Sequence, residues 1–129
     1  MRIFNTCISG TCLLDDYMVG VAMMGIIERM FCDISAIIGN NIVQRKWLTD
    51  QELIHYNLHA EIDIKHSEDF FDVIRCSYEK NEENRYHIEQ GLELGAILFF
   101  NLYKELYNHR KRRIERSYTG PHSRAEGVV

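Results

Sequence analysis

Apolar residues recur every three or four positions over most of the chain, a spacing that predicts helices. The stretch 15–38 is apolar around nearly its whole circumference, so it is predicted to be a central helix with neighbours on every side. An aspartate at 15 or 16 can cap its start, and the Gly-Asn pair at 39–40 is expected to end it. Residues 1–14 show no clear period and are predicted to be an irregular N-terminal segment.

Two further long helices are predicted downstream. Thr49 and Glu52 have the spacing of a capping box, so a helix is expected from about residue 50 to the polar run at 80–84. A third helix is expected from about residue 84 to 113. Within it Gly91 and Gly95 lie one turn apart, which permits the close approach of another helix.

These elements predict an all-α protein. The chain has 129 residues, enough for one domain, which we place at 15–113 as a helical bundle. Residues 114–129 include a Gly-Pro pair and are expected to be a disordered tail. Three helices bury an all-round apolar helix poorly, so a second copy of the chain or a complementing N-terminal segment is expected to cover it.

Composition and charge exclude several classes of partner. The net charge of −4 is unremarkable, and the basic cluster at 109–116 is interpreted as a solvated helix end, so no nucleic-acid partner is expected. The apolar stretch 18–38 contains Glu28, Arg29 and Asp33, which would be costly inside a bilayer, so no membrane span is expected. The four cysteines show no metal or disulfide spacing, which favours a reducing, cytoplasmic setting.

Candidate chemistry lies in the second predicted helix. His59, Asp63 and His66 are spaced i, i+4 and i+7, so they share one helix face. Two imidazoles and a carboxylate suit iron, manganese or zinc better than calcium or magnesium. His55, one turn earlier, is expected either to support these ligands or to be polar surface. Glu28 stands among apolar residues of the central helix, where a carboxylate is costly unless it is paired or bound to metal.

Two plainer interpretations remain open. Histidines on a helix are often solvated surface residues, and an H-x3-D-x2-H pattern arises by chance. Glu28 could instead pair with a basic residue on another helix.

The stretch LIHYNLHAEIDIKHSEDFF at 53–71 resembles the signature helix of the haem-oxygenase-like diiron oxidases and oxygenases. In that superfamily a glutamate precedes H-x3-D-x2-H by about thirty residues, and a final helix like IEQGLELGAILFFNLY follows. Glu28, His59, Asp63 and His66 match this order and spacing. Relatives include PqqC-like proteins, CADD-like para-aminobenzoate synthases and several N-oxygenases, and the resemblance covers roughly residues 15–110.

The resemblance implies a metal centre of Glu28, His59, Asp63 and His66, holding iron or possibly manganese, that oxidises a small organic substrate with O2. In the superfamily an N-terminal helix supplies a further glutamate and histidine, and residues 1–14 contain neither. The chain therefore resembles the C-terminal half of that fold, and the two-iron site would need another chain or segment. The alternatives are a degenerate member without turnover and a non-enzymatic helical interaction or oligomerisation module.

Overall fold

The computed structural model describes residues 2–118, with the side chains of 111–118 left aside. The helices are α1 (Arg2–Leu14), α2 (Tyr17–Gln44), α3 (Ile54–Tyr78) and α4 (Glu82–Tyr118), with a short 3-10 helix, η1 (Asp50–Glu52), before α3. No strand occurs in this part of the chain, and the four helices form a bundle, so the all-α prediction is confirmed.

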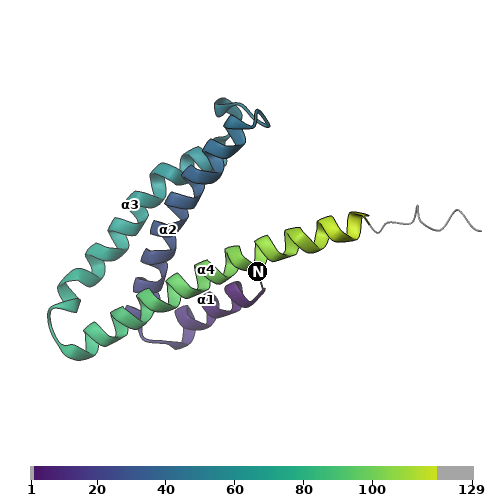
Figure 1. The fold of residues 1–129 in the computed structure, drawn as a ribbon. Helices are drawn as coiled ribbons and strands as arrows, with labels where there is room; N and C mark the ends of the chain where they lie inside the picture. The colour runs from purple at the N-terminus through teal and green to yellow at the C-terminus, as the bar shows by residue number, and fades with distance from the viewer. Residues whose placement is uncertain (1, 119–129) are drawn as a thin grey trace, which may run out of the picture.

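Helix α2 is the centre of the arrangement (Figure 1). It runs beside α3 as far as the loop that contains η1, and its N-terminal half crosses α4. Helices α3 and α4 touch each other little and diverge from the turn that joins them, while α1 lies along α4. The bundle is therefore an open V, with α2 packed against both arms.

The helix starts follow local rules that the sequence already carries. The Asp16 carboxylate accepts a hydrogen bond of 2.8 Å from the Met18 amide at the start of α2. The Glu52 carboxylate accepts from both the amide (2.9 Å) and the hydroxyl (2.7 Å) of Thr49, as the capping-box spacing predicts. The box opens η1 rather than α3 itself, so the long helix begins four residues later than expected.

Three predicted boundaries are wrong, and at the first two tertiary packing decides the matter. Residues 2–14 form helix α1 rather than an irregular segment, since Phe4, Cys7 and Ile8 recur at helical spacing and pack against the core. Helix α2 continues through Gly39 to Gln44, because Gly39 makes room for the Leu53 side chain and does not act as a stop. Helix α4 continues through residues 114–118, whereas the rest of the expected tail, 119–129, lies outside the described residues.

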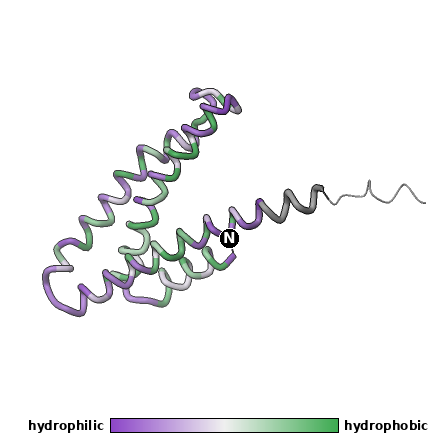
Figure 2. The backbone as a smooth tube through the Cα atoms, in the orientation of Figure 1, coloured by the Kyte–Doolittle hydropathy of each residue, from purple (hydrophilic) through white to green (hydrophobic). Residues whose placement is uncertain are grey.

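The core is built where α2 crosses its neighbours. Met23 is fully buried at the centre of one cluster, and Ala22 packs with Ile74 and Ile88 in a second. The predicted close approach is confirmed: a Cβ on Gly95 would lie 2.7 Å from the Met23 carbonyl oxygen. Figure 2 shows apolar positions along α2 and the middle of α4, and a hydrophilic turn between α3 and α4.

Outside these clusters much apolar surface stays exposed. On α3, Ile54, Leu58 and Ile62 lie one turn apart and are 72%, 53% and 36% exposed. On α4, Ile97 and Phe100 are also exposed. No helix in the described part of the chain is both long and apolar enough to cross a bilayer.

Candidate metal centre

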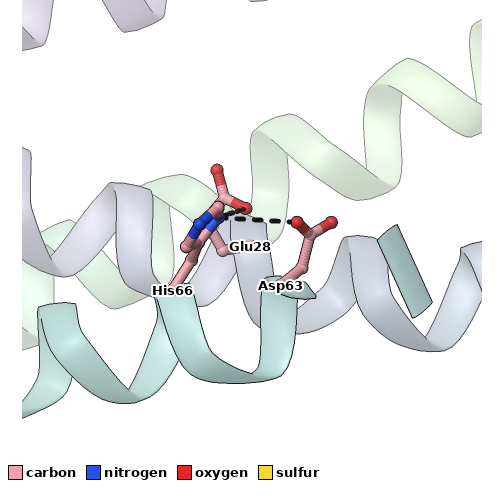
Figure 3. Close-up of side chains that lie close together, drawn as sticks. All are labelled: Glu28, Asp63 and His66. Carbon is pink, nitrogen blue, oxygen red and sulfur yellow. Dashed lines mark ion pairs between the residues drawn. The ribbon is translucent and has the colours of Figure 1, made fainter. Parts of the chain in front are cut away.

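Three of the four predicted ligands meet where the middle of α2 faces α3. Glu28 comes from α2, and Asp63 and His66 come from successive turns of α3 (Figure 3). One ligand atom from each residue lies within 4.8 Å of the others. The close packing of α2 on α3, with Gly25 against Phe71, brings Glu28 to this level.

The distances suit an ion placed between the three side chains. The Nδ1 atom of His66 is 3.8 Å from Glu28 Oε2 and 3.6 Å from Asp63 Oδ1. Donor atoms at about 2.1 Å from a tetrahedral or octahedral ion lie about 3.0–3.4 Å apart, so the two distances from His66 exceed those around a bound ion by a few tenths of an ångström. Asp63 is fully buried, the Glu28 side chain is 24% exposed and the His66 side chain is 46% exposed. The two carboxylates are thus the more buried ligands, and the His66 imidazole lies on the side of the site that is open to solvent.

The two carboxyl groups oppose each other electrostatically. Burial raises the pKa of Glu28, and the charge of Asp63 and a hydrogen bond with it raise this pKa further, while His66 and His59 act in the opposite direction. Among the ion pairs of the described residues, neither Glu28 nor Asp63 has a lysine or arginine partner. Arg29 pairs with Asp33 at 3.1 Å instead. Among the described residues, the alternative that a basic residue on another helix holds Glu28 is therefore limited to His66, at 3.8 Å.

His59, the fourth predicted ligand, is not in the three-residue cluster. Its Nδ1 lies 3.1 Å and 3.0 Å from the two carboxylate oxygens of Asp63, so it contacts the site through that residue. Helix α2 places Glu28 level with His66, one turn beyond Asp63, whereas His59 lies one turn before Asp63. The spacing rule alone predicts that three residues share a face, and the position of α2 decides which of them meet Glu28.

Two further side chains around this site carried no signal of their own in the sequence. Phe31 lies edge-on to His59, with ring centroids 5.2 Å apart, and also contacts Phe99 of α4. Cys32 donates its thiol proton to the Ala60 carbonyl at 3.1 Å, which ties α2 to α3 beside the ligands. In the sequence both residues are ordinary apolar positions of α2. Only the packing of α2 on α3 shows that they lie beside the candidate metal site.

The donor set fits a divalent transition ion. Two carboxylates and an imidazole, drawn from two packed helices, are the N/O ligands that iron, manganese and zinc accept. Two mutually repelling carboxyl groups, one fully and one partly buried, would gain most from a cation between them.

Comparisons of the chain with known protein families, with curated proteins and with solved structures found no match. The haem-oxygenase-like resemblance therefore depends on the residues quoted above.

Proposed function

We propose that this chain binds an iron ion through Glu28, Asp63 and His66 and serves in the O2-dependent oxidation of a small organic substrate. The observation that carries the metal assignment is the carboxylate pair of Glu28 and Asp63, which faces His66 and has no lysine or arginine partner among the described residues. The choice of oxidase chemistry comes from the order and spacing of the motif residues, which resemble those of the diiron oxidases. Manganese is the second candidate ion, since it accepts the same donors.

Each residue has a distinct task in this proposal. Glu28 and Asp63 supply negative charge that holds the ion, and His66 supplies the nitrogen donor. His59 donates from Nδ1 to the Asp63 carboxylate and so fixes the direction of that carboxylate. Bound iron would supply the activation of O2 and the electron transfer that protein side chains cannot provide.

Apolar side chains line one side of the proposed reaction space. Phe31 packs against His59, and Phe99 of α4 packs against Phe31, so one side of the site is apolar. Three protein ligands leave coordination positions free for substrate, for O2 or for ligands from a complementing helix. A second copy of the chain, or a separate segment that lies between the arms of the V, would supply that helix.

The test is iron content per chain, measured by elemental analysis on untagged protein that was expressed with iron and separated by size. We expect at least one iron per chain in the wild type and loss of iron in Glu28→Gln, Asp63→Asn and His66→Ala. His59→Ala should keep the site but weaken it by about 10–100-fold, because it removes the partner of a ligand rather than a ligand. His109→Ala is the matched control, since it removes an exposed histidine of α4.

The number of irons per chain distinguishes a complete two-iron site from a half-site. Two irons per chain, or per assembled unit, would mean that further ligands come from a partner, and O2 consumption with candidate substrates would be the next assay. One weakly held iron would indicate a half-site without turnover. Iron content that is unchanged in Asp63→Asn would refute the site.

A second candidate function is a non-catalytic helical interaction module. The stripe of Ile54, Leu58 and Ile62 on α3 favours it, because an exposed apolar row on a helix is typical of a partner surface. This function needs no metal. Sedimentation analysis of wild type and Leu58→Glu in the presence of EDTA would support it if the variant alone were monomeric.

A further inference from the structure

His55 and His59 lie one turn apart on α3. His55 precedes His59, whereas His66 follows it. Their ring centroids are 4.5 Å apart and their planes are inclined at 61°. An i, i+4 histidine pair on a helix places two imidazoles on one face, where both can bind a single ion. The site of Glu28, Asp63 and His66 does not use His55.

The contact between His59 and Asp63 determines which nitrogen of His59 is free. Nδ1 lies against both oxygens of Asp63, and a carboxylate only accepts hydrogen bonds, so Nδ1 carries the proton of the neutral ring. The lone pair is then on Nε2, at the opposite edge of the imidazole. A carboxylate that holds one nitrogen of a histidine while the other binds metal is a common arrangement in metalloproteins, and it makes the imidazole a better donor.

The distance between the rings matches what one shared ion requires. With nitrogen at about 2.1 Å from the ion, the centroids of two coordinating imidazoles lie about 4.6 Å apart for a right-angle site and about 5.3 Å for a tetrahedral one. The observed 4.5 Å is close to the first value, and rotation of the exposed His55 side chain from its edge-to-face contact would bring both rings to one ion.

Neighbouring rings hold this pair in place without covering it. Phe31 of α2 contacts both imidazoles, at 6.4 Å from His55 and 5.2 Å from His59 between centroids. Tyr56 lies 5.2 Å from His55 on its other side. His55 is exposed and the His59 side chain is 31% exposed, so an ion from solution can reach them.

We propose that His55 and His59 form a second metal site, for an imidazole-preferring divalent ion such as Ni²⁺, Cu²⁺ or Zn²⁺, beside the site of Glu28, Asp63 and His66. Asp63 links the two sites, because it ligates the ion in one and orients His59 in the other. The second site goes beyond the proposed oxidation and needs no residue from another chain, since water completes the coordination.

The experiment is a calorimetric titration of untagged, metal-free protein with Ni²⁺ alone. Wild type should bind two ions per chain, His55→Ala one and Glu28→Gln one, and the double variant none. Moving the histidine by one position, in Ile54→His with His55→Ala, keeps the histidine count but turns the imidazole about 100° off the shared face. This variant should bind one ion, like His55→Ala. Ile54 and His55 are both exposed, and circular dichroism checks that the variants fold.

The outcomes distinguish this inference from the proposed function. If His55→Ala binds as many Ni²⁺ ions as wild type with the same affinities, the second site is refuted, while an ion lost in Glu28→Gln would still support the first. If His55→Ala loses an ion and Glu28→Gln does not, the second site stands and the iron site fails. If the displaced histidine restores the lost ion, the shared-face geometry is wrong and the inference is overturned.

Discussion

Replacing Glu28 with glutamine should stabilise the metal-free protein and at the same time abolish its stabilisation by metal. The Glu28 carboxyl is largely buried beside the fully buried Asp63, and burial and that neighbour raise the pKa of Glu28. Glutamine keeps the shape of the side chain, removes the charge and offers an amide that can donate to Asp63. The same change removes a proposed metal ligand.

The magnitudes follow from the separation of the ligand atoms, which lie within 4.8 Å of one another. Two unit charges at that distance repel by about 3 kcal/mol at an effective dielectric constant of ~20. Attraction to His66 and His59 and the raised pKa of Glu28 reduce this repulsion, so we expect a gain of about 1 kcal/mol, or ~4 °C in melting temperature. An ion at 100 times its dissociation constant should stabilise wild type by about 2.7 kcal/mol and Glu28→Gln by almost nothing.

The assay is thermal unfolding followed by circular dichroism, under anaerobic conditions, with EDTA or with Fe²⁺. Glu61→Gln, at an exposed position of α3, is the matched control and should change neither curve by more than about 0.5 kcal/mol. A Glu28→Gln variant that melts below wild type in EDTA would show that the carboxylate is satisfied without metal. Equal stabilisation of both proteins by Fe²⁺ would remove Glu28 from the site.

Three further predictions concern charge and packing. In EDTA, the stability advantage of Glu28→Gln over wild type should grow as pH rises from below 4.5. The folded-state pKa of Glu28 is raised, so the wild type has stability at acid pH that it loses as pH climbs through this pKa. Melting curves at several pH values would show a constant difference between the two proteins if this is wrong. Gly91→Ala should destabilise by about 1–3 kcal/mol, because its Cβ would lie 2.8 Å from the Ala22 side chain, whereas Gly10→Ala, with nothing within 4 Å, should stabilise by about 0.5–1 kcal/mol in urea unfolding. Met23→Ala should cost about 2–5 kcal/mol in the same assay, since Met23 is fully buried in the core, and a loss below about 1 kcal/mol would contradict that burial.

The positions of the metal-binding candidates show what local sequence can predict. Asp63 and His66 had to share a face once α3 formed, because helical geometry alone sets the direction of side chains three residues apart. Glu28 stood out as a carboxylate in an apolar helix, a cost that needs a partner whatever the fold. The all-α class followed in the same way from apolar periodicity.

Tertiary packing decided what periodicity leaves open. Gly39 looks like a helix stop, yet α2 continues past it because the glycine lies against Leu53 of another element. The segment at 2–14 has too weak a period to predict, and it is helical against α2 and α4.

Some features of the candidate site were likewise predictable from the sequence, and others depended on the fold. The sequence by itself determined which residues could bind metal, since their chemistry and their helix face are local properties. Only the crossing of α2 over α3 decided that Glu28 meets Asp63 and His66 and not His59. The axial level at which two helices pack depends on how side chains such as Gly25 and Phe71 interlock, and no spacing along one helix encodes it.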